Sequence, residues 1–188
     1  MKTNTKNIFF AFELPESAIQ MIEAFQHDLR RNLRGPLIRW TSPEAWHVKT
    51  HHVGEATEKT VQNLRDAMSL FRRDPVEFSM WSLDVFPNIE NPKKLVLRFA
   101  DPTSNAFKLH GSHIPMLLRE AIKINTRPWE PHITLGRIIP GRSGLKVNLS
   151  EIHVPQQTFP ISKLTLFESF RGPGVRYEPI RRLSLPRT

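Results

Sequence analysis

The sequence predicts an α+β fold, and three observations carry this prediction. Amphipathic helical segments alternate with short β-type runs, some of these runs are arranged as hairpins, and neither a composition shift nor a low-complexity tract separates them. Helices and strands in such mixed and hairpin order are typical of the α+β class. The 188 residues, 39% of them hydrophobic, suffice for one sizeable core. We therefore expect a single domain over residues 1–188.

The first half of the chain alternates between apolar runs of strand length and apolar residues at helical spacing. A run of β-branched and aromatic residues that ends at a glycine predicts a strand. Apolar residues that recur three and four positions apart predict a helix. In order, the predicted elements are a strand at 8–14, a helix between Pro15 and Gly35-Pro36, a strand at 46–53 and a helix over 61–71 that ends at Asp74-Pro75.

The second half of the chain is expected to be richer in strands. Gly111 and Pro115 fall inside its helical segment and predict a break or a kink there. In order, the predicted elements are a hairpin of 76–86 and 95–99 around the loop 88–94, a helix over about 104–123, a strand at 132–138, a turn at 140–144, and strands at 163–169 and 176–185 joined by the turn 171–174.

Charge and residue usage exclude several classes of function. Lys and Arg outnumber Asp and Glu by 27 to 18, which gives a net charge of +9 and suits an anionic partner, either nucleic acid or an anionic membrane surface. The absence of cysteine excludes disulfides, thiolate zinc sites and cysteine nucleophiles. No apolar run approaches the roughly 18 to 20 residues of a membrane span, and no signal peptide is visible. We expect a cytoplasmic protein, and nothing indicates more than a monomer.

Two of the eight histidines share a local pattern. His47 and His132 each begin a β-type run, each is followed by an apolar residue, and each has a hydrogen-bonding side chain two positions on, Lys49 and Thr134. Because residues i and i+2 of a strand face the same side, each histidine shares a face with that side chain. The two segments are 85 residues apart, 132 minus 47, and each follows a helical region, which suggests an internal duplication.

A pair of imidazoles on facing strands suits phosphodiester chemistry. One neutral imidazole takes a proton from the attacking water or hydroxyl, and the other, protonated, gives a proton to the leaving oxygen. The donor two residues on would hold the phosphate oxygens. This chemistry requires neither a metal nor a cofactor, and we expect none. On local pattern alone, partly buried strand histidines without a catalytic role explain the two residues as well.

Longer stretches of the chain resemble the 2H phosphoesterase superfamily, and more closely its RNA 2′,3′-cyclic phosphodiesterase branch, also called RNA 2′-5′ ligase. The resemblance runs over roughly residues 8 to 185 in the right order. The stretches that carry it are Ile8-Phe9-Phe10-Ala11-Phe12-Glu13-Leu14-Pro15, Arg39-Trp40-Thr41 leading to Trp46-His47-Val48, Val85-Phe86-Pro87 with Pro92-Lys93-Lys94-Leu95, Pro131-His132-Ile133-Thr134-Leu135-Gly136-Arg137, and Leu164-Thr165-Leu166-Phe167-Glu168-Ser169 with Tyr177-Glu178.

The resemblance implies a bilobal fold in which two pseudo-symmetric lobes of mostly antiparallel sheet, with helices outside, enclose a central cleft. It implies metal-independent opening of a 2′,3′-cyclic phosphate at an RNA end to a 2′-phosphate, with RNA 2′-5′ ligation as a further activity. By the same resemblance, His132 would activate the water, His47 would protonate the departing 3′ oxygen, Thr134 would bind the phosphate and Arg137 would add positive charge. The pseudo-symmetry makes the opposite division of roles equally plausible.

The first histidine segment departs from the family pattern. Lys49 stands where a Thr or Ser is expected, Thr50 where Leu usually follows, and His52 at a Phe position. An ammonium at Lys49 can bind a phosphate oxygen as a point charge and would lower the pKa of a neighbouring imidazole. Strand alternation places Thr50 and His52 on the core side. It places His51 on the side of His47 and Lys49, either as a strand-edge residue that faces water, which is the favoured interpretation, or as a third cleft group.

The other aromatic and histidine residues give weaker indications. Trp129 and Trp46 lie just before the two segments, where an indole ring can stack on a base. His110 and His113, three apart on a helix, have metal-ligand spacing without an evident third ligand. Two other functions stay open: an RNA-binding module that has lost turnover, and a phosphodiesterase for small 2′-5′ or cyclic nucleotides.

Overall fold

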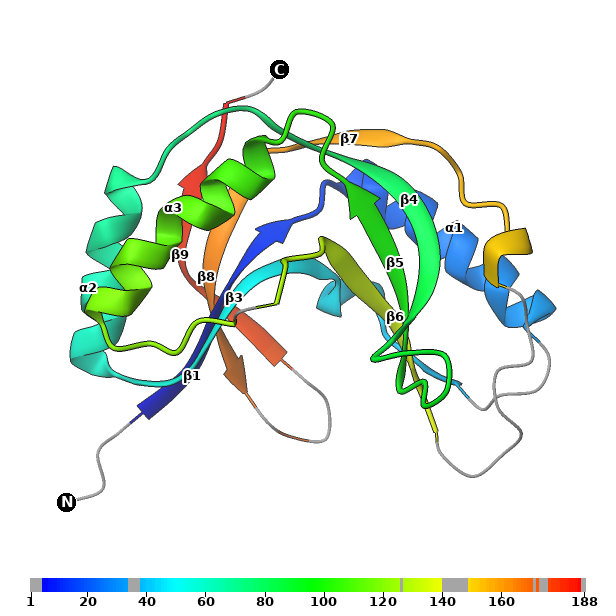
Figure 1. The fold of residues 1–188 in the computed structure, drawn as a ribbon, viewed down its shortest axis with the longest axis horizontal. Helices are drawn as coiled ribbons and strands as arrows, with labels where there is room; N and C mark the ends of the chain where they lie inside the picture. Colours follow the sequence, from blue (N-terminus) through cyan, green and yellow to red (C-terminus); the bar gives the residue numbers. More distant parts are fainter. Residues whose placement is uncertain are drawn as a thin grey trace.

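The computed structural model describes residues 5–33, 38–125, 127–139, 149–170, 172 and 176–186. Two antiparallel sheets, each strongly curved, form the body of the molecule (Figure 1). The first sheet has the strand order β3-β1-β8-β9. Its strands are β1 (Thr5–Glu13), β3 (His47–Thr57), β8 (Lys163–Phe170) and β9 (Arg176–Ser184).

The second sheet has the strand order β2-β6-β5-β4-β7. Its strands are β2 (Ile38–Trp40), β4 (Val76–Phe86), β5 (Lys94–Ala100), β6 (His132–Ile138) and β7 (Thr158–Ile161). The segments that carry the two histidine patterns thus lie in different sheets, one in each lobe. This confirms the predicted α+β class and the bilobal arrangement of mostly antiparallel sheet.

In the described part of the chain, three α-helices flank the sheets: α1 (Glu16–Asn32), α2 (Glu58–Ala67) and α3 (Asn105–Arg119). Figure 1 shows α2 and α3 together beside the first sheet, and α1 along the outer side of the second. Short 3-10 helices occupy Pro43–Ala45, Met68–Leu70 and Leu149–Glu151. Among the described residues, no helix is long and apolar enough to cross a membrane.

Helix α1 follows the predicted pattern closely. The four apolar residues at offsets of 4, 3 and 4, Ala18, Ile22, Phe25 and Leu29, are all buried. A proline at the N-terminal boundary is compatible with helix initiation because the first turn needs no bond from its missing N–H, and Pro15 is the cap residue here. The predicted stop at Gly35-Pro36 lies outside the described residues, as does the predicted turn at 140–144.

One hydrophobic cluster spans both sheets. It includes Phe10 and Phe12 from the first sheet and Phe78 and Leu97 from the second, each with no more than 1% of its surface exposed. Phe12 meets Phe78 edge-on with ring centroids 5.4 Å apart. The two lobes therefore share a packed core, which holds their histidine-bearing strands in a fixed relation.

Three differences from the sequence-based expectation concern the elements themselves. Helix α3 runs without interruption through Gly111 and Pro115, so the predicted break is wrong. Gly111 has open space around it and Pro115 is tolerated as an interior residue. Strands β2 and β7 were not predicted, because three and four residues are too few to show a period.

Both histidine strands contain a β-bulge at the same distance from the histidine. In β3, Lys49 and His51 pair with consecutive residues of β1, which leaves Thr50 as the extra residue. In β6, Thr134 and Gly136 pair with consecutive residues of β5, which leaves Leu135 as the extra residue. A bulge reverses the inward and outward alternation of side chains beyond it. Side chains after each bulge therefore face the opposite way from the one that strict alternation from the histidine predicts.

Candidate active site

A cleft of about 500 Å³ is lined by residues from both sheets, and both patterned histidines lie in it. His47 is the first residue of β3 and His132 the first of β6. The predicted phosphate-binding residues Lys49, Thr134 and Arg137 line the same cleft. The structure therefore brings together the five side chains that sequence reasoning assigned to catalysis and phosphate binding.

The His132 ring is held by one hydrogen bond and one aromatic contact. Its Nδ1–H donates a hydrogen bond to the carbonyl oxygen of Glu130 at 2.7 Å, so Nε2 is the nitrogen available for chemistry. Phe86 meets the ring edge-on at 4.7 Å. Burial lowers the pKa of His132, the hydrogen bond to Glu130 opposes this shift, and the nearby Lys94 adds to it.

The His47 ring lies among aromatic side chains. It stacks on Phe9 at 4.8 Å and meets Tyr177 edge-on at 4.8 Å. The pKa of His47 is lowered to about 3, mainly by burial and secondly by the charge of Lys49, while a backbone hydrogen bond at Ala45 partly opposes both. Like His132, His47 thus has a backbone partner two residues earlier in the chain.

Lys49 shares the cleft side of β3 with His47, as predicted. Its Nζ lies 4.1 Å from the centroid of the Phe9 ring, within cation–π range. Burial lowers the pKa of Lys49 to about 8, and the charges of Lys94 and Arg137 contribute. This mutual repulsion indicates a site that is short of negative charge.

The charge of the cleft is wholly positive over the described residues. Arg39, Lys49, Lys94 and Arg137 line it, and none of its described lining residues carries a carboxylate. Such a concentration of cations attracts a phosphate group and offsets its charge. Sequence reasoning missed Lys94 and Tyr177 as cleft residues, although both lie in stretches that carry the family resemblance.

Arg137 reaches the cleft because of the bulge at Leu135. Simple alternation from His132 and Thr134 would turn residue 137 to the opposite face, and the extra residue restores it to the cleft side. The bulge turns Gly136 inward, where its backbone packs so closely that an added Cβ would lie 2.4 Å from the Ile38 side chain. A side chain at this position of the second segment would therefore displace its neighbours.

The equivalent bulge at Thr50 corrects the predicted orientations in β3. His51 was expected on the cleft side and His52 on the core side, and both expectations are wrong. His51 is 7% exposed and packs on α3, whereas His52 is exposed. Thr50 is buried as predicted, and its hydroxyl lies within hydrogen-bond distance of the Phe10 carbonyl.

His51 joins His110 and His113 in a buried cluster under β3. The His51 ring stacks on His110 at 4.0 Å, and its Nε2 donates to the His110 carbonyl at 3.0 Å. His113 is fully buried and stacks on Phe71 at 4.1 Å. Over the described part of the chain, no group of three or more His, Cys, Asp or Glu side chains is placed to hold a metal ion.

The two tryptophans suggested for base stacking have different surroundings. Trp46 is 5% exposed and belongs to the core, so no face of its ring is open to a base, and that suggestion is wrong. Trp129 is partly exposed, with one face stacked on His110 at 4.7 Å and its Nε1 donating to the Lys49 carbonyl at 2.8 Å. Stacking of a base on its remaining surface stays a prediction.

Sequence comparison shows that part of the chain is similar to the LigT like phosphoesterases, and comparison with solved structures shows a similar fold. The LigT like phosphoesterase family matches residues 12–96, which include His47 and end before His132. The resemblance predicted from the sequence is thereby confirmed, and the relationship supports a phosphoesterase of the cyclic phosphodiesterase type.

The individual relatives are distant in sequence and similar in fold. An RNA 2′,3′-cyclic phosphodiesterase of Bacillus subtilis (strain 168) is 24% identical over 155 residues, covering 78% of this chain and 80% of that protein. The crystal structure of E. coli LigT complexed with 3′-AMP has a TM-score of 0.76 at 19% identity, covering 97% of this chain and 99% of LigT. A protein of Thermus thermophilus has a TM-score of 0.70 at 23% identity, covering 95% of this chain and 97% of that protein.

Proposed function

We propose that this protein hydrolyses 2′,3′-cyclic phosphate ends of RNA to 2′-phosphates, with His47 and His132 as a metal-independent acid–base pair. One observation carries the proposal: histidines from two different sheets line a single cleft of about 500 Å³ together with four cationic residues. Acid–base catalysis needs one group that accepts a proton and one that donates it, and a phosphodiester supplies the negative charge that the cleft lacks.

The reaction exchanges one phosphorus–oxygen bond for another. A water oxygen bonds to phosphorus while the bond from phosphorus to O3′ breaks. One histidine removes the water proton, and the other gives a proton to O3′, which leaves as a hydroxyl. If a ribose 5′-hydroxyl replaces water, the same steps yield a 2′–5′ phosphodiester, so RNA 2′-5′ ligation is part of the proposal.

The charges around the two rings favour His47 as the base and His132 as the acid. The Lys49 ammonium beside His47 adds to the lowering of its pKa and keeps that imidazole neutral, as a base requires. The pKa of His132 is also lowered, by burial and by the charges of Lys94 and Arg98, but the Glu130 carbonyl and carboxylate both oppose this shift and favour the protonated form. This division is the reverse of the one implied by the family resemblance, and it rests on the burial of His47 first and on the charge of Lys49 second.

The cationic residues and Thr134 would hold the phosphate. Lys49, Lys94 and Arg137 repel one another in the cleft, and a bound phosphate relieves that repulsion. The same negative charge raises the pKa of His132 and so assists its protonation. Thr134 supplies a hydroxyl donor from the cleft side of β6. The name of the Bacillus subtilis relative is consistent with this substrate.

The proposal is tested by following a short RNA with a 2′,3′-cyclic phosphate end by phosphorus NMR in the presence of EDTA. The expected result is conversion to a 2′-phosphate at a rate that EDTA does not change. A 3′-phosphate product, or activity that EDTA abolishes and a divalent ion restores, would contradict the mechanism.

A substrate with sulfur in place of O3′ tests the division of roles. A thiolate leaves without a proton from an acid, because a thiol has a pKa of about 8.5 and an alcohol a far higher one. We expect this substrate to restore turnover in His132→Ala and not in His47→Ala. Restoration in His47→Ala alone would reverse the assignment.

An RNA-binding protein without turnover is the second candidate. The observation that favours it is Lys49, which occupies the position of a phosphate-binding hydroxyl and lowers the pKa of the adjacent His47. Folded protein that binds the RNA end and releases no product would support this candidate over the first.

A further inference from the structure

A second groove adjoins the cleft and has no role in the proposed reaction. Its volume is about 660 Å³, within the roughly 300 to 1,000 Å³ of sites that hold small ligands. His132 and Lys94 line both the cleft and this groove, so the two are continuous. The β4–β5 connection forms one of its walls, and the α3–β6 connection forms the other, as Pro87 and Arg127 in its lining indicate.

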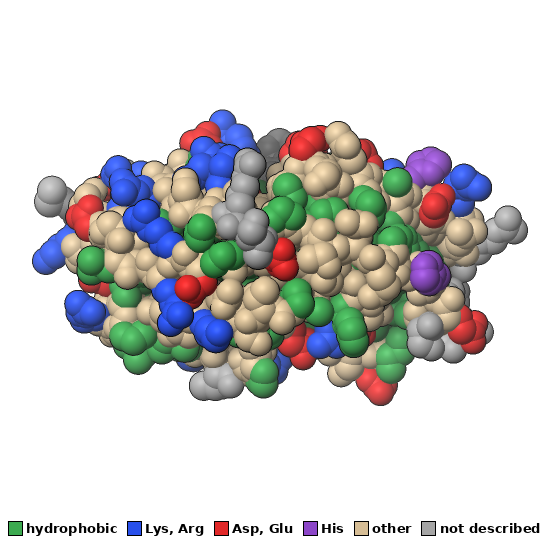
Figure 2. Space-filling view, turned by 90° about the horizontal axis from the view of Figure 1, so that it is seen from above, with side chains coloured by type: hydrophobic (Ala, Val, Ile, Leu, Met, Phe, Trp, Pro, Cys, Tyr) green, Lys and Arg blue, Asp and Glu red, His purple; other side chains and the backbone are tan. Residues whose placement is uncertain are grey.

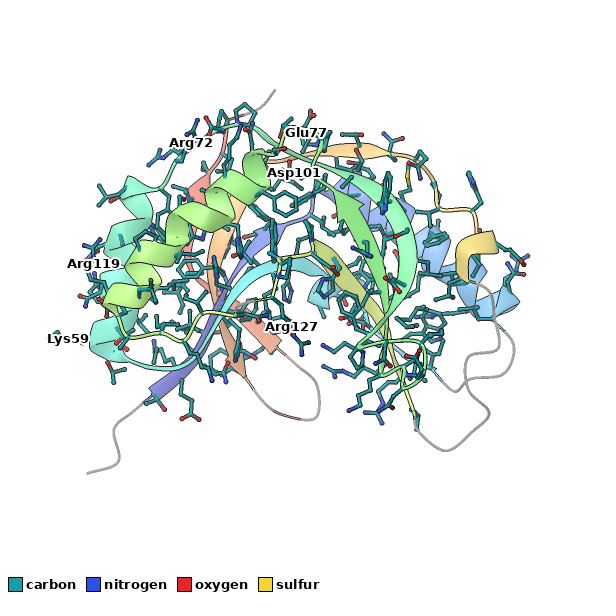
Figure 3. All side chains as sticks on the ribbon, viewed as in Figure 1. Lys59, Arg72, Glu77, Asp101, Arg119 and Arg127 are labelled. Atoms are coloured by element: carbon teal, nitrogen blue, oxygen red, sulfur yellow. The ribbon has the colours of Figure 1, made fainter. Side chains whose placement is uncertain are left out.

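The charge of this flanking groove is positive on both walls. Lys93 and Lys94 come from the β5 side, and Arg127 comes from the opposite connection. Figure 3 shows Arg127 in the middle of the molecule between the two sheets. Within the described part of the chain no ion pair involves these three cations, whereas the one acidic lining residue, Glu130, is paired with Arg98 at 3.4 Å. Phosphates thus meet free positive charge along the groove.

Aromatic side chains lie at the far end of the flanking groove. Trp129 and Glu130 line both this groove and a smaller hollow of about 210 Å³ beyond it. Trp81 and Phe107 border that hollow with 60% and 45% of their surface exposed. Figure 2, which views the molecule from above, shows apolar side chains scattered among cations on that face. Trp81 is the extra residue of a bulge in β4, since Met80 and Ser82 pair with consecutive residues of β5.

We propose that the flanking groove and the hollow beyond it bind the single-stranded RNA on the 5′ side of the cyclic phosphate, with phosphates at Lys93 and Arg127 and a base on Trp81. Single-stranded RNA is recognised by a basic path combined with aromatic rings on which bases stack, and these residues supply both in one continuous track. A mononucleotide bound in the cleft would not reach the flanking groove or the hollow beyond it. The proposed site therefore binds only oligonucleotides.

The chemistry of the cyclic end determines which RNA segment lies there. A 2′,3′-cyclic phosphate terminates the strand, so the remaining nucleotides continue only in the 5′ direction. His132 lines both the cleft and the flanking groove. When the cyclic phosphate lies at His132, the next nucleotide on the 5′ side therefore enters the flanking groove. This inference rests on the proposed function, since it takes the cyclic phosphate as the group bound in the cleft.

The test is equilibrium binding of a fluorescent tetranucleotide that ends in a 2′-phosphate, compared with the 2′-phosphomononucleotide of the same base. The tetranucleotide should bind more tightly to the wild type. Arg127→Ala should weaken its binding and reduce the slope of log affinity against log salt by about 0.7, the contribution of one phosphate contact to a single strand. Trp81→Ala should weaken it by roughly 5- to 150-fold, as expected for a lost stacking partner. Mononucleotide binding should stay unchanged in both variants.

Arg119→Ala is the matched control, because this exposed arginine lies at the end of α3 away from the groove (Figure 3). Equal affinities for the tetranucleotide and the mononucleotide would overturn the inference, as would equal effects of Arg127→Ala and Arg119→Ala. Groove-dependent binding without hydrolysis would uphold it while the proposed function fails. If instead the protein hydrolyses cyclic-phosphate mononucleotides and tetranucleotides with equal kcat/KM, the proposed function would hold and the inference about the groove would fail.

Discussion

Thr50 in β3 and Leu135 in β6 are equivalent residues: each is the extra residue of a bulge, three positions after a cleft histidine. A side chain from a flanking helix binds the carbonyl of each. The His110 ring has a hydrogen bond to the Thr50 backbone, and Gln26 Nε2 donates to the Leu135 carbonyl at 3.0 Å. Each lobe therefore fixes its histidine strand to the helix that covers it.

Loss of the Gln26 amide should impair the second histidine strand. Gln26 is 2% exposed and also donates to the Thr41 carbonyl at 2.9 Å. Gln26→Leu removes both bonds and should lower the free energy of unfolding by about 1–3 kcal/mol. It should also lower kcat more than it raises KM, because His132 shifts with its strand. Urea unfolding and steady-state kinetics measure the two effects, and an unchanged kcat would refute the positioning role. Gln20→Leu, at an exposed position of α1, is the control.

Two glycines should respond to alanine with opposite signs. In Gly136→Ala the new Cβ would lie 2.4 Å from Ile38 Cγ2 and 3.3 Å from the Arg39 carbonyl oxygen, so overpacking should cost about 1–3 kcal/mol. In Gly111→Ala the Cβ meets nothing within 4 Å, and the better helix propensity of alanine should stabilise by up to about 1 kcal/mol. Thermal unfolding of both variants decides this, and a stable Gly136→Ala would contradict the packing described for the bulge.

The charge at Lys49 should control the acidic limb of the pH profile. Burial is the main cause of the low pKa of His47, and Lys49 the second, so Lys49→Thr should raise that pKa and leave it below 6.5. If His47 is the base, the acidic limb of kcat/KM moves to higher pH, and KM rises because an ammonium is lost from the phosphate site. NMR titration of His47 and the pH profile measure both effects. If the acidic limb of kcat/KM does not move in Lys49→Thr, a group other than His47 causes that limb. Lys59→Thr on α2 is the control and should leave the limb in place.

The buried histidine cluster should make the fold sensitive to acid. Burial lowers the pKa of His113 well below 6.5, so below pH 6.5 the unfolded chain takes up a proton that the folded chain does not. Stability is therefore complete above pH 6.5 and is lost as the pH falls, by up to about 1.4 kcal/mol per pH unit for this one group.

Replacement of His113 isolates its share of that acid sensitivity. His113→Leu should flatten the dependence of the free energy of unfolding on pH between about 7 and 5, measured in urea. The exposed His27→Leu should leave it unchanged. Parallel curves for the wild type and His113→Leu would show that other groups cause the loss.

The sequence predicted most of the fold because its longer elements have clear periods and boundaries. The apolar offsets in α1, the hairpin of β4 and β5, and the strands β6, β8 and β9 all appear where expected. Strands β2 and β7 escaped prediction because three or four residues show no alternation, and they are strands only through their partners β6 and β4.

The candidate site was predictable in its residues and not in its orientations. His47, Lys49 and Thr134 lie before their bulges, where alternation from the histidine holds. His51 and His52 lie beyond a bulge, and nothing in the local sequence marks Thr50 as an extra residue, because the bulge depends on pairing with β1. Long-range pairing of this kind decides side-chain direction and is not encoded in the spacing of one segment.

His47 and His132 are proposed to act as one catalytic pair, and the most direct test is the hydrolysis of a cyclic-phosphate RNA by His47→Ala, His132→Ala and the double variant. Each single loss should lower kcat by roughly 100- to 10,000-fold. Groups that act as a unit are not additive, so the double variant should be little worse than either single one. Near-normal hydrolysis by either folded single variant would contradict the two-histidine account.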